Sequence, residues 1–137
     1  MNADLIAHAM DTPVQHRVDA LLERCKMEPQ VVMPLTHEFT PGLYIRTIVM
    51  PKGTFVISKF HKTEHPFVIT RGKVEVWTEG QGTKMLTAPH RGITKPGTRR
   101  MLVMHEETEW TTFHPTTKTD LAEIERDLIY NPETDHD

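Results

Sequence analysis

Two histidines four residues apart, His61 and His65, are the side chains of this sequence best suited to chemistry. They lie in the segment GTFVISKFHKTEHPFVITRG, residues 53–72. An imidazole nitrogen can bind a transition metal, and it can also gain or lose a proton near neutral pH. The segment therefore predicts a metal site, the remnant of one, or a strand-turn-strand unit whose histidines lie at a bend.

Length and composition limit the classes of protein to which the chain can belong. It has 137 residues, of which 37% are hydrophobic and 26% charged, and this is typical of one globular domain. Its net charge of −3 disfavours a broad nucleic-acid surface. The single cysteine, Cys25, cannot form an internal disulfide. We find no secretory signal and no apolar segment long enough for a membrane span, so we expect a protein that is not secreted.

The middle of the chain, residues 30–115, has the pattern of a β-domain. Short segments rich in β-branched and aromatic residues alternate with turn signals such as Pro41-Gly42 and Pro96-Gly97. Strands of this length and spacing, with no helix-length spacer between them, predict an antiparallel sandwich or barrel.

Helical patterns flank this domain. Residues 1–29 are predicted to contain an N-terminal helix, and residues 116–131 a C-terminal helix that begins at Thr119 or Asp120 as N-cap. Residues 132–137 are predicted to be a flexible tail. The apolar stripe of the second helix consists of Leu121, Ile124 and Leu128.

The spacing around the two histidines resembles the first cupin motif. That motif has a glycine, five residues, His-x-His, three or four residues, glutamate, six residues and a second glycine. Gly53, His61 and Gly72 occupy motif positions, whereas Lys59 replaces the first histidine and His65 stands at the glutamate position. The segment KPGTRRMLVM resembles the second motif, with arginine at position 100 in place of its histidine.

A narrower resemblance, from about residue 31 to the end of the second helix, is to small cupin-like proteins of tailed bacteriophages and prophages. It is based on HKTEH and MHEETEWTTFHPTTKTDLAEIE. It implies a mainly β fold, a cupin-like antiparallel β-barrel (double-stranded β-helix) with an N-terminal and a C-terminal helix. It also implies a place in the bacterial host cytoplasm or in the virion. In those relatives a histidine stands where this chain has Lys59.

The first interpretation of the pocket is a divalent transition metal (Fe, Ni, Mn or Zn) bound by His61, His65 and His114. Whether His114 points inward depends on the turn between residues 99–105 and 109–114. A three-residue turn pairs position 100 with 114 and turns His114 inward, whereas a two-residue turn sends it outward. The cations Lys59 and Arg100 would repel a metal ion.

The second interpretation is a cationic pocket for a small anion, and the third is a degenerate site that binds no small ligand. Strand alternation predicts that positions 59 and 61 both point into the barrel. Glu64 is an acid/base candidate by type, but we expect it to face solvent or pair with Lys62. The ligand-binding set is Lys59, His61, His65, Arg100 and His114.

Three functions are compatible with this reading. The leading hypothesis is an accessory or binding protein whose barrel pocket holds a metal or a small anion. The second is a metal-dependent isomerase or oxygenase that acts on a small sugar or acid. The third is a structural, oligomerising component of a phage particle. Exposed sheet edges predict a homo-oligomer, with no nucleic-acid or membrane partner.

Overall fold

The computed structural model describes residues 20–21 and 31–130. Within these residues the chain forms nine β-strands and one complete α-helix. Their bounds are β1 Leu35–Thr40, β2 Leu43–Met50, β3 Phe55–Ile57, β4 His65–Arg71, β5 Lys73–Thr78, β6 Gly82–Thr87, β7 His90–Thr94, β8 Arg100–Met104, β9 Thr108–Pro115 and α3 Leu121–Leu128.

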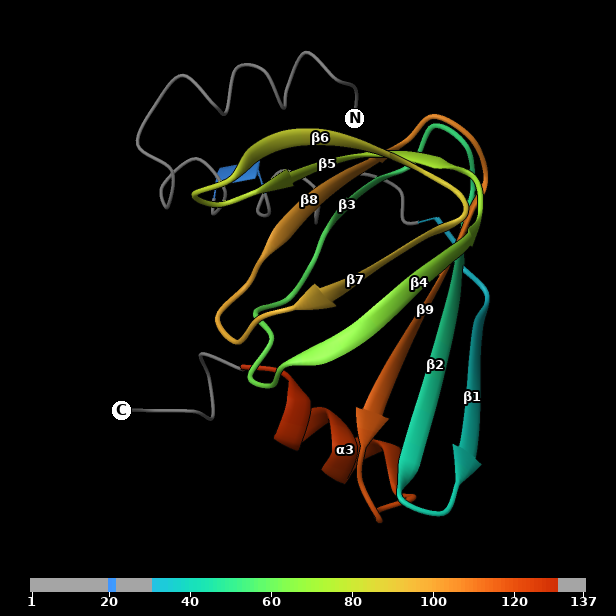
Figure 1. The fold of residues 1–137 in the computed structure, drawn as a ribbon, viewed down its shortest axis with the longest axis vertical. Helices are drawn as coiled ribbons and strands as arrows, with labels where there is room; N and C mark the ends of the chain where they lie inside the picture. The colour runs from blue at the N-terminus through green and yellow to red at the C-terminus, as the bar shows by residue number, and fades with distance from the viewer. Residues whose placement is uncertain (1–19, 22–30, 131–137) are drawn as a thin grey trace.

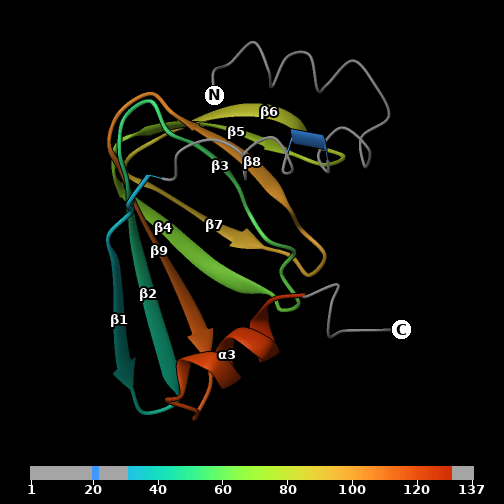
Figure 2. The ribbon, with the colours of Figure 1, turned by 180° about the vertical axis from the view of Figure 1, so that it is seen from behind.

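The strands form two antiparallel sheets that face each other. The five-stranded sheet has the order β1-β2-β9-β4-β7, and the four-stranded sheet has the order β3-β8-β5-β6. The two sheets approach each other at one end and diverge at the other, where α3 lies beside β2 and β9 (Figures 1 and 2). This arrangement confirms the predicted mainly β, antiparallel barrel with a helix after it.

The predicted hairpin between β8 and β9 is wrong. β8 pairs with β3 and β5, whereas β9 pairs with β2 and β4 in the opposite sheet. Residues 105–107 cross from one sheet to the other, so neither of the two predicted registers occurs. Arg100 lies opposite Thr78, and His114 lies opposite Tyr44. Alternation along each strand predicts its faces, but it cannot tell whether consecutive strands pair or cross.

A cluster of apolar side chains joins the two sheets. Phe67 and Trp110 stack with their ring centroids 4.6 Å apart, and Ile69 and Val74 are completely buried. Burial of these side chains is the main stabilising term for the barrel, at about 1.5–3 kcal/mol for each large side chain. The buried members are Met50, Phe67, Ile69, Val74, Val76, Leu102, Met104 and Trp110.

The C-terminal helix begins as the sequence predicts. The Asp120 carboxylate accepts a hydrogen bond from the Glu123 backbone N–H at 3.1 Å, and this satisfies a free donor of the first turn. Ile124 is buried, whereas Leu121 is 43% exposed, so the apolar stripe is only partly covered.

No helix within the described residues is long and apolar enough to cross a membrane.

One predicted element lies mostly outside the described residues, and another differs from its prediction. Of the predicted N-terminal helix only residues 20 and 21 are described, and both are helical; the rest of residues 1–29 and the tail 132–137 lie outside the described residues. The strand that was predicted to turn positions 59 and 61 inward is shorter than expected, since β3 ends at Ile57. Position 59 is therefore not part of a regular strand.

Gly72 connects β4 to β5 in a conformation that only glycine adopts easily. Its φ is +105°, and a Cβ atom at this position would lie 2.3 Å from the Glu107 carbonyl oxygen and 2.6 Å from the Thr108 Cα. Gly80 also has a positive φ, of +81°, but a Cβ there would meet nothing within 4 Å. The two positions share the backbone requirement and differ in the available space.

Gly72→Ala is expected to destabilise the protein by roughly 3 kcal/mol or more, because it adds a backbone clash to an unfavourable φ. Gly80→Ala, the matched control, should cost only about 1 kcal/mol. Urea unfolding followed by circular dichroism measures both differences. Equal losses of unfolding free energy in the two variants would contradict the close approach at Gly72.

Candidate functional site

The site is a cavity of about 630 Å³ between the two sheets, and α3 forms part of its wall. Its polar lining consists of His37, Tyr44, Arg46, Ser58, Lys59, His61, His65, Thr94, Arg100, Thr112, His114 and Glu125. Its apolar lining consists of Met33, Leu35, Ile48, Met50, Val56, Ile57, Leu102, Trp110, Leu121, Ile124, Leu128 and Ile129. A cavity of this size and mixed lining is typical of a site for a small organic molecule.

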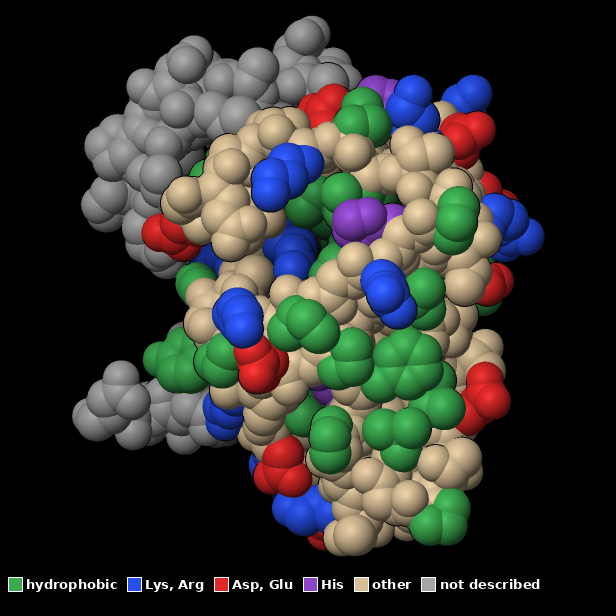
Figure 3. Space-filling model, in the orientation of Figure 1, with side chains coloured by type: hydrophobic (Ala, Val, Ile, Leu, Met, Phe, Trp, Pro, Cys, Tyr) green, Lys and Arg blue, Asp and Glu red, His purple; other side chains and the backbone are tan. Residues whose placement is uncertain are grey.

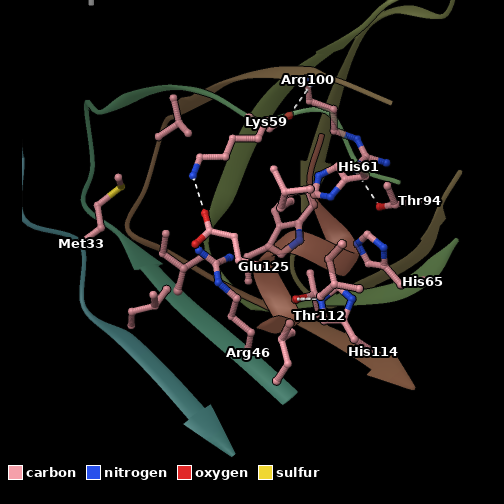
Figure 4. Close-up of a pocket in the computed structure, with 18 of the residues that line it drawn as sticks. Met33, Arg46, Lys59, His61, His65, Thr94, Arg100, Thr112, His114 and Glu125 are labelled. Carbon is pink, nitrogen blue, oxygen red and sulfur yellow. Dashed lines mark hydrogen bonds and ion pairs between the residues drawn. The ribbon is translucent and has the colours of Figure 1, made fainter. Parts of the chain in front are cut away.

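The three predicted histidines are neighbours in this cavity. The ring centroids of His61 and His65 lie 5.0 Å apart, and those of His65 and His114 lie 4.4 Å apart. Figure 4 shows the three rings together on one side of the pocket. His65 and His114 are almost completely buried, at 2% and 4% exposure. The inward direction of His114, which the sequence left open, is therefore settled by the structure.

Each histidine is positioned by a different element. His65 is the first residue of β4, and His114 is the next-to-last residue of β9. His61 lies in the connection between β3 and β4, where its N–H donates to the Thr98 carbonyl at 3.2 Å and its carbonyl accepts from Gly97 at 2.7 Å. The turn at Gly97 therefore holds His61 in the cavity.

A hydrogen bond fixes the tautomer of His65, whereas one nitrogen each of His61 and His114 has no hydrogen-bond partner among the described residues. His65 Nδ1 lies 3.1 Å from the Thr63 carbonyl oxygen, which can only accept, so Nδ1 carries the proton and Nε2 has a free lone pair in the neutral ring. His114 Nε2 lies 2.8 Å from Thr112 Oγ1. The Nδ1 atoms of His61 and His114 are buried with no hydrogen-bond partner among the described residues. Both are therefore polar atoms buried without a hydrogen bond to a described residue.

Burial keeps the three rings uncharged at neutral pH. It lowers the pKa of His61 to about 4, and His65, Arg100 and Arg46 lower it further by repulsion. Burial, followed by the charges of His65, His61 and Arg46, lowers the pKa of His114 to about 3. The pKa of His65 is also lowered, mainly by burial, although its bond to Thr63 opposes the shift. The cluster therefore offers neutral N–H donors and lone pairs.

Arg100 lies in the cavity wall as predicted. Its Nη1 donates to Thr94 Oγ1 at 2.8 Å, and its guanidinium lies 5.2 Å from the ring centroid of Phe67 and 6.0 Å from that of Trp110. Burial lowers the pKa of Arg100, but a guanidinium remains charged at neutral pH. Within the described residues no carboxylate forms an ion pair with it.

Lys59 does not point into the barrel as predicted. Its side chain is 66% exposed, and its Nζ forms an ion pair at 2.8 Å with Glu125 of α3 (Figure 4). The prediction assumed that residues 59 and 61 share the face of one strand, whereas β3 ends at Ile57. Lys59 therefore lies at the rim of the cavity and connects the β3–β4 segment to the helix.

Two charged residues of the pocket were not predicted. Arg46 lies on β2 and Glu125 lies on α3, and both line the cavity. Arg46 was detectable, because β2 alternates and position 46 shares its face with Tyr44 and Met50, which are buried. An arginine on the inner face of a strand indicates a site. Glu125 was not detectable, because nothing in the sequence says which sheet α3 covers.

Glu64 is outside the site. Its carboxylate is exposed and forms an ion pair with Lys95, not with the predicted Lys62. It faces solvent as expected, so it is not positioned for acid/base chemistry in the cavity.

The histidines do not form a prearranged metal site. Among the residues that the structure describes, no group of three or more His, Cys, Asp or Glu side chains is arranged to hold a metal ion. The charge of Arg100 also lowers the pKa of His61 and His65, and the same repulsion would act on a divalent cation. The predicted metal set of His61, His65 and His114 would need the rings to turn before they could share an ion.

Comparison with known proteins identifies the fold. No protein-family model and no curated protein match the sequence. Among solved structures, a cupin superfamily protein from Desulfitobacterium hafniense is 8% identical with a TM-score of 0.52, and the match covers 64% of this chain and 81% of that one. The Cupin_2 domain of an XRE family transcriptional regulator from Enterobacter cloacae is 14% identical with a TM-score of 0.50. That match covers 61% of this chain and 98% of the other chain. The chain has a cupin-like fold.

This cupin-like fold also occurs in an enzyme. Salicylate 1,2-dioxygenase from Pseudaminobacter salicylatoxidans is 14% identical with a TM-score of 0.57, over 80% of this chain and 34% of that one. Identities this low establish a shared fold only, because one fold can support unrelated activities. The predicted resemblance to cupins is confirmed at the level of the fold.

The buried neutral histidines predict a loss of stability in acid. The unfolded chain binds protons near the ordinary histidine pKa of about 6.5, whereas His61 and His114 in the folded state resist protonation down to about 4 and 3. Their stabilising effect is therefore complete above pH 6.5 and is lost as the pH falls through this window. Each histidine contributes at most about 1.4 kcal/mol per pH unit to the slope of the unfolding free energy against pH.

Urea unfolding at a series of pH values measures this slope. In His61→Gln the slope of the unfolding free energy against pH should fall by the contribution of one histidine. Leu102→Ala, which removes core contacts but no titratable group, should lower stability and leave the slope unchanged. An unchanged slope in His61→Gln would contradict the burial of a neutral imidazole at position 61.

Proposed function

We propose that this protein is a cupin-type binding protein that holds a small organic anion in its barrel pocket. The observation on which this depends is the Arg100 guanidinium, which lies in the cavity wall with Thr94 as a neutral partner and no ion-paired carboxylate among the described residues. A charge away from water is stable only with compensation, and a carboxylate or phosphate group would supply it. The apolar lining would contact the rest of the ligand.

The test is binding of butyrate, benzoate and inorganic phosphate at low ionic strength, measured by thermal shift and calorimetry. We expect at least one of these anions to raise the melting temperature. Arg100→Gln should weaken its binding roughly 10-fold or more, because a charge-assisted hydrogen bond contributes about 1.5–3 kcal/mol.

Lys52→Gln is the control, because Lys52 is an exposed cation in the turn after β2 and does not line the cavity. It should leave binding unchanged. Circular dichroism shows whether each variant folds, and Thr94→Val, which removes the hydrogen bond to Arg100, is a second and milder perturbation. If no anion stabilises the wild type, or if Arg100→Gln binds as tightly as the wild type, the proposal is wrong.

A metal-dependent cupin enzyme is the second candidate function. It is favoured by the adjacency of three neutral imidazoles and by the Thr63 carbonyl, which holds the His65 proton on Nδ1 and leaves Nε2 free. Elemental analysis of protein purified without added metal distinguishes the two candidates. Near-stoichiometric iron, nickel, manganese or zinc that is lost in His65→Ala would favour the enzyme.

An accessory or structural role in a phage particle stays a prediction from the sequence resemblance.

The outer face of the five-stranded sheet supports the predicted homo-oligomer. Strand pairing places Ile45 beside Phe113 and Pro66 beside Ile93, so apolar side chains form one row across the sheet. Ile93 is 53% exposed. Figure 3 shows hydrophobic side chains gathered over β4, β9 and β2 on this face. An exposed apolar row of this length is unusual for a surface in contact with water alone.

We propose a second copy of the chain as the partner of this row. Glu38 lies at the β1 end of the sheet and Arg91 at the β7 end. A two-fold axis parallel to the strands would bring each Glu38 toward the other copy's β7 edge, which carries Arg91. The face is therefore complementary to itself in charge as well as in apolar character.

Ile93→Glu should dissociate the oligomer, because it places a carboxylate in the proposed interface. Met85→Glu is the control, since Met85 is similarly exposed, at 45%, but lies on β6 of the other sheet. Size-exclusion chromatography with light scattering measures the mass of each. A monomeric wild type, or dissociation by Met85→Glu alone, would contradict this interface.

A further inference from the structure

The cavity contains two arginines that come from opposite sheets. Arg46 projects from the middle of β2 in the five-stranded sheet, and Arg100 projects from the first position of β8 in the four-stranded sheet. Both line the same cavity. In Figure 4 they lie on different sides of His61. The pocket therefore has two separate positive ends.

The electrostatic effects on the histidines agree with this separation. Repulsion from both Arg46 and Arg100 lowers the pKa of His61. Of the two arginines, only Arg100 has a resolved effect on the pKa of His65, and only Arg46 has one on that of His114. These effects agree with the placement of the two arginines on different sides of His61 in Figure 4.

The charge of Arg46 is only partly compensated by the protein. Glu125 is an acidic group close enough to feel this charge, because Arg46, after Lys59, contributes to the lowered pKa of the Glu125 carboxyl. However, the carboxylate of Glu125 forms its ion pair with Lys59, at 2.8 Å. Among the described residues Arg46 has no ion pair of its own. The mouth of the pocket therefore combines two cations with a single carboxylate.

We propose that the natural ligand is a dianion, with one carboxylate or phosphate group at Arg100 and a second at Arg46. This inference rests on the proposed anion-binding function and specifies its ligand class. The neutral rings of His61, His65 and His114 can donate hydrogen bonds to the ligand between its two charged ends. The apolar wall, which includes Met50, Leu102 and Trp110, contacts its carbon skeleton.

The cavity volume is consistent with a ligand that reaches both ends. About 630 Å³ is within the range of pockets for organic molecules and exceeds what a single phosphate or acetate ion would fill. A monoanion would leave one arginine without a counter-charge. A dianion with a flexible or apolar spacer would compensate both, so its affinity should depend on the length of the spacer.

The test compares two series of probes, the α,ω-diacids from malonate to suberate and the monocarboxylates of the same chain length. Calorimetry at low ionic strength measures each dissociation constant. We expect one diacid to bind at least 10-fold more tightly than its matched monocarboxylate. Arg46→Gln should remove that advantage while leaving monocarboxylate binding within about 3-fold of wild type, and Arg100→Gln should weaken both series.

Two further variants keep the test decisive. Arg46→Lys retains the charge and should preserve part of the preference for the diacid, which covers the case in which Arg46→Gln does not fold. Lys52→Gln, in the exposed turn after β2, should change neither series. Equal affinity for diacids and monocarboxylates would overturn the dianion while leaving the anion-binding function intact. No binding by either series would overturn both.

Discussion

The central constraint in this structure is the placement of fixed positive charge beside uncharged imidazoles in a partly buried cavity. Arg100 is held in the wall by Thr94 and by the faces of Phe67 and Trp110, without an ion-paired carboxylate in the described part of the chain. Burial, followed by repulsion from neighbouring positive charges, lowers the pKa of each of the three histidines. The resulting pocket presents fixed positive charge together with neutral hydrogen-bonding groups.

The C-terminal helix completes this pocket. Backbone hydrogen bonds join its end to the β3–β4 connection, from Lys62 to the Leu128 carbonyl at 2.7 Å and from Tyr130 to the Phe60 carbonyl at 2.9 Å. The Lys59–Glu125 ion pair adds a second link at the rim. The same connection that carries His61 therefore also anchors α3, so the position of the histidine and the closure of the cavity depend on each other.

Several features could be predicted because they depend on local chemistry. Asp120 caps α3 because its carboxylate reaches a backbone donor three residues later. Gly72 adopts a positive φ because a turn between two strands requires it there. Arg46 was equally open to prediction, because alternation places it on the inner face of β2. Lys59 was placed wrongly, because β3 ends before it.

The sequence alone determined the antiparallel barrel, its resemblance to cupins, and the identity of His61, His65 and Arg100 as residues of one pocket. Turn signals, strand alternation and motif spacing are local properties, and they are sufficient for these conclusions. Only the tertiary structure decided that His114 faces inward, that Arg46 and Glu125 share the cavity, and that β8 and β9 belong to different sheets. These facts depend on contacts between segments distant in the chain, whose pairing local spacing cannot specify.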